Sequence, residues 1–335
     1  GVIGSITPVT NPTATIINNS ISMLAAGNAV VFNPHPSAKM CSNKTVEIIN
    51  DAIIKAGGPK HLVNSVAEPS IDTAKALMAH RKVNLICATG GKAVVKEALR
   101  SGKKAIGAGA GNPPVVVDET ADIIKAAHDI VCGASFDNNL PCIAEKELIA
   151  VEAIADRLIE RLAREGAYIL RGKDIDRMTE LIFDEKFNVN KDLIGKDASY
   201  ILKQIGIDVG SDVRLVVMPV DPEHPLVHHE QMMPVLPFVR VPNVEEAIEL
   251  AVRAEGRNKH TAIMHSKNID NMTNFARAIQ TTIFVKNAPS YAGIGAGGEG
   301  YAAFTIAGPT GEGLTSAKNF TRQRRCVLVD AFRII

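Results

Sequence analysis

The sequence contains no tryptophan, only 4% aromatic residues and almost no net charge. Its 37 lysines and arginines balance 36 aspartates and glutamates, which argues against a nucleic-acid-binding protein because such proteins carry clustered basic residues. No apolar run reaches the ~18 residues that a membrane span needs, and the first residues lack the pattern of a signal peptide. We therefore expect neither nucleic acid nor a membrane as a partner.

Cysteine is scarce, and its pattern excludes several classes of site. The sequence has five cysteines, none of them spaced as C-x-x-C: Cys41, Cys87, Cys132, Cys142 and Cys326. An odd number without that spacing excludes a zinc ribbon and argues against a secreted disulfide framework, so we expect a reducing cytoplasm. His228, His229 and Glu230 do not have H-E-x-x-H spacing, and we predict no metal site.

The length of 335 residues exceeds the ~250–300 residues at which a single core stops growing, which predicts two domains. Short β-branched runs alternate with amphipathic segments of helical length, a pattern typical of an α/β protein with parallel sheets. The Gly- and Pro-rich segment GAGAGNPP at 107–114 interrupts the alternation, and we place the domain boundary there. Near the end of the chain, RCVLVDAF at 325–332 is predicted to form a strand.

Cys142 is the cysteine best placed for chemistry. It lies in the polar, turn-rich segment SFDNNLPC, whereas the other four fall in predicted strands and helices. A cysteine in a polar loop is better placed to act as a reactive thiolate, because reactivity requires partial exposure. A second candidate is the turn at Thr89, Gly90 and Gly91, which follows a predicted strand and opens a helix. Its amides could face a phosphate, although an ordinary tight turn explains the same residues equally well.

Several strings then point together to one family. The segments SFDNNLPCIAEK, FVKNAPSYAGIG and PTGEGLTSA, with HEQMMPVLP and GAGAGNPP, resemble the aldehyde dehydrogenase superfamily, and within it the CoA-acylating propionaldehyde and acetaldehyde dehydrogenases of bacterial microcompartments. The resemblance implies a Rossmann-type nucleotide-binding domain at 1–109, an α/β catalytic domain at 110–313, and a C-terminal return with an oligomerisation strand at 314–335. Because the chain starts at Gly1 inside an apolar run, we expect the first domain to be incomplete at its N-terminus.

The resemblance also implies roles for individual residues. Cys142 matches the catalytic nucleophile, and either Thr10 or Asn11 matches the amide position of the oxyanion hole, together with the backbone N–H of Cys142. The positions implied to bind the cofactor include the turn that meets the phosphates and the acidic residue that meets the nicotinamide ribose: Thr89, Gly90, Gly91 and Glu230.

Two departures from the family pattern are informative. Gly107 stands where hydrolytic aldehyde dehydrogenases carry the glutamate that activates water, which favours release of the acyl group to a thiol. Asn33 stands where many relatives have a lysine that contacts the adenosine ribose. We include Asn33 and Gly107 among the expected cofactor-binding residues, and the choice of NAD over NADP comes from the resemblance alone.

The expected function is oxidation of propionaldehyde or acetaldehyde with NAD and coenzyme A to acyl-CoA, through a thioester on Cys142. The alternatives are a hydrolytic aldehyde dehydrogenase or an inactive core fragment. The resemblance further implies a homo-oligomer, dimer or tetramer, in the lumen of a bacterial microcompartment. Contact with the shell would require an N-terminal peptide that this sequence does not include.

Overall fold

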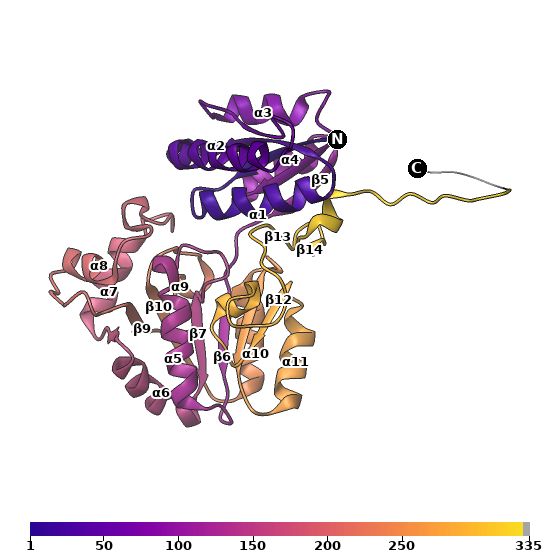
Figure 1. The fold of residues 1–335 in the computed structure, drawn as a ribbon. Coiled ribbons are helices and arrows are strands. Elements are labelled where there is room, and N and C mark those ends of the chain that lie inside the picture. Colours follow the sequence, from indigo (N-terminus) through magenta and orange to yellow (C-terminus); the bar gives the residue numbers. More distant parts are fainter. Residues whose placement is uncertain (331–335) are drawn as a thin grey trace.

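The computed structural model describes residues 1–330, which form two parallel sheets flanked by helices (Figure 1). The first sheet has the strand order β3-β2-β1-β4-β5. Its elements in chain order are β1 (Val2–Thr7), α1 (Pro12–Ala25), β2 (Ala29–Pro34), α2 (Lys39–Lys55), β3 (Val63–Ser65), α3 (Ile71–Ala79), β4 (Leu85–Thr89), α4 (Lys92–Arg100) and β5 (Lys104–Ala108).

Separate apolar cores cover the two faces of this sheet. Ile16 and Met23 of α1 and Val46 of α2 pack on one face, while Met78 of α3 and Ala98 of α4 pack on the other. The chain winds from β1 to β2 in one direction and places β4 on the other side of β1, so the order reverses between β1 and β4. In doubly wound sheets, ligands bind in the crevice at the carboxyl ends of the strands at such a reversal.

The second sheet has seven parallel strands in the order β12-β11-β6-β7-β10-β9-β8. Its elements are β6 (Pro114–Val117), α5 (Ile123–Ala134), β7 (Glu147–Val151), α6 (Glu152–Arg164), β8 (Ala167–Ile169), α7 (Lys173–Ile182), α8 (Ala198–Gln204), β9 (Leu215–Pro219), α9 (Pro225–His228), β10 (Val235–Val241), α10 (Val244–Glu255), β11 (Thr261–His265), α11 (Ile269–Ile279) and β12 (Ile283–Lys286). The strands β6, β7 and β11 are buried at every position, as expected for parallel strands covered on both faces. The predicted α/β class is therefore confirmed.

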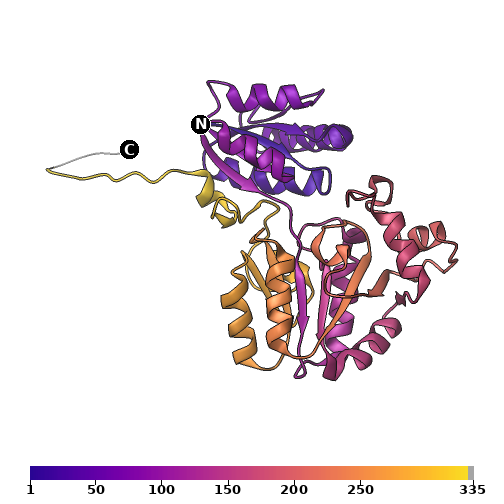
Figure 2. The ribbon, with the colours of Figure 1, turned by 180° about the vertical axis from the view of Figure 1, so that it is seen from behind.

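Two segments cross between the sheets. Residues 109–113 lead from the end of β5 to the start of β6, and Figure 2 shows this linker as one stretch of chain without a helix or strand. The chain then returns through β13 (Ile306–Ala307), β14 (Gly313–Leu314) and the 3-10 turn Ala317–Phe320, which packs on α1. Hydrogen bonds from Asn28 Nδ2 to Phe320 O at 3.0 Å and from Thr305 Oγ1 to Asn19 Oδ1 at 3.0 Å attach this return to the first sheet.

The strand predicted over RCVLVDAF is wrong for the single chain. Residues 322–329 form no helix or strand and extend away from both sheets (Figure 1), and 331–335 lie outside the described residues. Val327, Leu328 and Val329 are 70%, 56% and 81% exposed. A strand needs the backbone of a neighbour to pair with, and this apolar segment has no such neighbour in the described chain.

Candidate active site

Cys142 lies in the turn between α5 and β7, at the edge of the second sheet where β7 begins. Before it, Asp137, Asn138 and Asn139 adopt three consecutive left-handed conformations, with φ of 47°, 51° and 62°. Such a conformation costs roughly 1–2 kcal/mol per non-glycine residue. The turn that carries Cys142 must therefore be held by contacts outside its own backbone.

Buried polar contacts tie both flanks of this turn. The Asn139 amide nitrogen donates to Ala134 O and Glu145 O, both at 2.8 Å. The Lys146 ammonium donates to Asn139 O at 2.8 Å, to Asn139 Oδ1 at 2.5 Å and to Pro141 O at 3.3 Å. The turn is thus anchored to the end of α5 and to the start of β7, and Cys142 is held between these anchors.

Gly111 of the linker brings Cys142 close to His260. A Cβ atom added at Gly111 would lie 2.4 Å from Cys142 O and 2.9 Å from His260 Cγ, distances at which something must move. The linker can pass between the two residues only because position 111 has no side chain. Gly111 therefore sets how closely the turn before β7 and the residue before β11 approach.

His260 is a functional candidate that the sequence did not reveal. Its side chain is 1% exposed, its Nδ1 lies 2.9 Å from Thr261 Oγ1, and its buried Nε2 has no hydrogen-bond partner. Burial lowers the pKa of His260 to about 4, with a further contribution from Lys146, so the ring is neutral at pH 7. A histidine before an apolar strand is an ordinary sequence feature, and only the contact through Gly111 distinguishes it.

The thiol of Cys142 has a higher pKa than its position in a polar loop would suggest. The residue is half-buried, and burial raises its pKa to about 12, with Glu230 raising it further and Lys146 opposing. Glu230 also has a raised pKa, chiefly from burial, which the Lys146 ammonium, the Gly111 backbone and Lys92 oppose. Burial therefore favours the neutral thiol at pH 7, and the role of Cys142 as a thiolate nucleophile stays a prediction.

The predicted phosphate turn lies at the carboxyl edge of the first sheet. Thr89 ends β4, and Gly91 is the N-cap of α4. A Cβ atom added at Gly90 would have only Val94 within 4 Å, at 3.9 Å, and one added at Gly91 would have no neighbour within 4 Å. This open space at a helix N-terminus leaves room for an anionic group near the first amides. The Thr89 hydroxyl already has a buried partner, because it lies 2.9 Å from Thr305 Oγ1.

Thr10 and Asn11 follow β1, on the other side of the same crevice. Asn11 Oδ1 accepts hydrogen bonds from Thr10 Oγ1 at 3.2 Å and from Thr15 Oγ1 at 3.3 Å. These two bonds orient the Asn11 amide, so that its nitrogen points away from both hydroxyls. The Thr10 hydroxyl is occupied by its bond to Asn11, which makes Asn11 the better placed donor of the pair.

Two expected cofactor residues have other contacts. Gly107 donates its N–H to Thr310 Oγ1 at 3.0 Å, and a Cβ there would lie 2.6 Å from Val95 Cγ1. Gly107 thus packs between β5 and α4, and its contact with the cofactor stays a prediction. Asn33 is 3% exposed, and its Oδ1 accepts from Thr73 Oγ1 at 2.7 Å, so that oxygen already serves to hold α3.

Within residues 1–330, no three His, Cys, Asp or Glu side chains gather so as to hold a metal ion. His228 and His229 instead bond backbone carbonyls, those of Pro222 at 3.0 Å and Pro225 at 2.9 Å. In the same part of the chain, no helix has the length and apolar character to cross a membrane.

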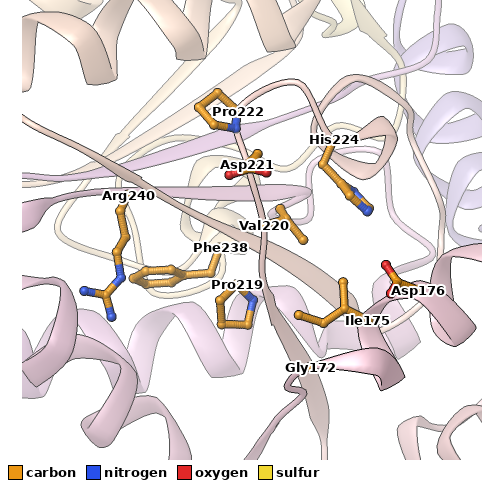
Figure 3. A pocket seen from close by; sticks show the side chains of 10 residues that line it. All are labelled: Gly172, Ile175, Asp176, Pro219, Val220, Asp221, Pro222, His224, Phe238 and Arg240. Atoms are coloured by element: carbon orange, nitrogen blue, oxygen red, sulfur yellow. The ribbon is translucent and has the colours of Figure 1, made fainter.

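A separate hollow of about 450 Å³ lies at the opposite edge of the second sheet, where β8 and β9 end (Figure 3). Asp176 and His224 lie on one side of the segment 219–222, and Phe238 and Arg240 lie on the other. Arg240 pairs with Asp156 at 2.5 Å, and His224 Nε2 lies 3.0 Å from Thr179 Oγ1. None of the predicted site residues lines this hollow.

The aldehyde dehydrogenase family model matches residues 1–310. The chain belongs to the aldehyde dehydrogenase family. This finding confirms the resemblance drawn from the motifs, and with it the Rossmann-type first sheet and the α/β second sheet.

The similar proteins belong to one group within this family, the CoA-acylating aldehyde dehydrogenases. The chain is 52% identical over 335 residues to a CoA-propanoylating propanal dehydrogenase of Salmonella typhimurium, covering 100% of this chain and 72% of that one. A propionaldehyde dehydrogenase of Rhodopseudomonas palustris, solved with bound CoA and an acylated cysteine, has a TM-score of 0.97 and 57% identity, covering 100% and 76%. A propionaldehyde dehydrogenase from a Clostridium phytofermentans fucose-utilisation microcompartment is also similar, at 53% identity. It was solved as a histidine-to-alanine variant and as a cysteine-to-alanine variant, with TM-scores of 0.97 and 0.96 to this structure. Each match covers 100% of this chain and 77% of the other.

We predict that Gly111→Ala lowers turnover about 100-fold while the protein stays folded, because a displacement of about 1 Å at a reacting group can cost that much. The added methyl must displace Cys142 or His260. Gly109→Ala is the matched control, since its Cβ would make only an ordinary 3.4 Å contact with Pro309. Steady-state kinetics with circular dichroism would contradict the prediction if both variants lost activity equally.

Proposed function

We propose that this protein oxidises a short-chain aldehyde, propionaldehyde or acetaldehyde, with NAD and coenzyme A, through a thioester on Cys142. The observation that carries the proposal is that the backbone carbonyl of Cys142 and the ring of a neutral, buried His260 both approach Gly111. The relatives' CoA-acylating activity and the acylated cysteine of the Rhodopseudomonas enzyme support it.

The first sheet fits the cofactor that this reaction needs. Gly90 and Gly91 leave space at the N-terminus of α4, at the reversal of strand order, and would hold the phosphates through backbone amides. Glu230, beside Gly111, would hold the nicotinamide ribose, as the resemblance implies. When bound, NAD supplies the acceptor for the aldehyde hydride.

Cys142 attacks the aldehyde carbon, and its proton must leave as the bond forms because the resting thiol is protonated. The negative charge on the aldehyde oxygen is stabilised by the Asn11 amide nitrogen and the Cys142 backbone N–H. Loss of one such donor typically costs on the order of 100- to 1000-fold in turnover. Loss of hydride converts the adduct into a thioester on Cys142.

His260 then accepts the proton of the CoA thiol, whose sulfur attacks the thioester and releases Cys142. A neutral imidazole with an unpartnered Nε2 has the protonation state that a base requires. In the clostridial relative, the substituted cysteine and histidine are separated by as many residues as Cys142 and His260 are here. The same pair of positions was thus altered in that enzyme.

We predict that Cys142→Ala abolishes NADH formation from propanal, and that the wild-type protein forms NADH over many turnovers only with added CoA. Cys132→Ala is the matched control, because Cys132 is a free cysteine in α5, before the turn that carries Cys142. Absorbance at the NADH wavelength measures both results. Sustained NADH formation with free propionate and no CoA would instead support the hydrolytic alternative, and no NADH under either condition would support an inactive fragment.

We predict that His260→Asn retains a single-turnover burst of NADH but loses turnover by roughly 100-fold or more, because general-base catalysis contributes on that order. The acyl group should then accumulate on Cys142 and be detected by intact-protein mass spectrometry. An equal loss of the burst would show that His260 also acts in the first half-reaction, contrary to this assignment.

We also propose a homo-oligomer in which the exposed segment 325–329 pairs with a second copy, because Val327, Leu328 and Val329 are apolar and unpaired in the single chain. Location in a microcompartment lumen is supported by the source of the clostridial relative. Shell contact through an N-terminal peptide stays a prediction.

For the oligomer, we expect Val329→Asp to reduce the molar mass measured by light scattering to that of one chain. Ile71→Asp is the control, since Ile71 is 75% exposed at the start of α3. An unchanged mass in the Val329 variant would refute pairing through this segment.

A further inference from the structure

We infer that Lys146 is a positioning residue for Cys142: its buried ammonium group fixes the turn at 139–141 and balances negative charge on the sulfur. This inference rests on the proposed role of Cys142 as nucleophile. No motif pointed to Lys146, which lies four residues after Cys142, directly before β7.

The hydrogen bonds of Lys146 favour its charged form. Its side chain is 1% exposed, and three oxygens lie within hydrogen-bond distance of its nitrogen: Asn139 O, Asn139 Oδ1 and Pro141 O. A neutral amine carries two N–H bonds and an ammonium carries three, so three acceptors suit the ammonium better. Burial lowers the pKa of Lys146, while Glu230, Cys142, Glu145 and Glu147 raise it.

The orientation of the Asn139 amide is independently determined. Its nitrogen donates to two carbonyls, Ala134 O and Glu145 O, so its oxygen must face Lys146. The backbone of Lys146 is also held, because its N–H donates to Pro113 O at 3.0 Å and its carbonyl accepts from Gln231 Nε2 at 3.2 Å. The cation therefore has a fixed place between the turn and the residues next to Glu230.

Four acidic groups interact with the Lys146 ammonium, and they differ in how strongly their ionised forms depend on it. Burial raises the pKa of Glu145 to about 7, and that carboxyl already accepts two hydrogen bonds from Ser290 at 2.8 and 2.7 Å. Burial raises the pKa of Glu147 well above its usual range, and neither of its oxygens has a hydrogen-bond partner, which favours the protonated form. Glu230 and the sulfur of Cys142 remain as the groups whose ionised forms Lys146 stabilises, because its charge lowers both of their pKa values against the effect of burial.

Three further titratable groups lie in this region: His260, Glu255, whose Oε1 accepts from the His260 backbone N–H at 2.9 Å, and Lys92, which lowers the pKa of Glu230. Lys146 contributes to keeping His260 neutral. One cation thus acts on both partners of the proposed chemistry: it favours the thiolate of Cys142 and disfavours the protonated form of His260. Both effects depend on the charge of Lys146, whereas fixing the turn depends on its N–H donors. The two contributions can be separated by substitution.

The test is the rate of Cys142 alkylation by iodoacetamide, without cofactor or substrate, so the result does not depend on turnover. Lys146→Gln keeps N–H donors but removes the charge, and should slow alkylation about 10-fold at pH 8, because the rate follows the fraction of Cys142 that is thiolate. Lys146→Arg keeps the charge and should retain a rate near that of the wild type. Mass spectrometry with fragment ions must distinguish Cys142 from Cys132, since no Lys or Arg separates them.

A purely structural lysine would lower the unfolding temperature of Lys146→Gln without changing the rate of Cys142 alkylation at pH 8, and that result would overturn the inference. If Lys146→Gln does not fold, Glu230→Gln is compared with the double variant Lys146→Gln and Glu230→Gln, which leaves no unpaired Glu230 charge. The double variant should then be alkylated more slowly, and equal rates would overturn the inference. Failure of the proposed function would appear separately, as absence of CoA-dependent NADH formation.

Discussion

At Gly111 the linker between the two sheets passes against the carbonyl of Cys142 and the ring of His260, with no room for a methyl group. This contact joins three segments that are far apart in the sequence. The linker ends the nucleotide-binding sheet, the turn at Cys142 precedes β7, and His260 precedes β11. Because the first sheet presents its carboxyl edge and the second its amino edge, the site is assembled from strand ends that belong to different sheets.

The same region buries more ionisable groups than a dry interior easily tolerates, and it limits their charge. Cys142 with a pKa of about 12 and His260 with a pKa of about 4 are both neutral at pH 7. Without a bound substrate, burial therefore favours the thiol form of Cys142 over the thiolate.

The sequence predicted well those features that depend on local pattern. Periodic apolar segments indicated the helices and strands, and the polar string around Cys142 indicated the turn before β7. The sequence did not reveal His260 or Lys146, because their burial and contacts depend on segments remote in sequence. The tail was wrong for the opposite reason: RCVLVDAF has strand composition, but its pairing partner is not in the single chain. Gly107 has packing contacts with Val95 and Thr310 that the sequence did not reveal, and its contact with the cofactor stays a prediction.

The surroundings of Gly107 also bear on why a thiol and not water would release the acyl group. An added Cβ at position 107 would lie 2.6 Å from Val95 Cγ1, so a carboxylate side chain there would require Val95 to move. The base that remains is His260, whose lowered pKa makes it a weak one. A thiol has a pKa of about 8.5 and water one of about 15.7, a difference of roughly 10 kcal/mol in the cost of deprotonation. A weak neutral base in a dry site can therefore assist attack by a thiol far more effectively than attack by water.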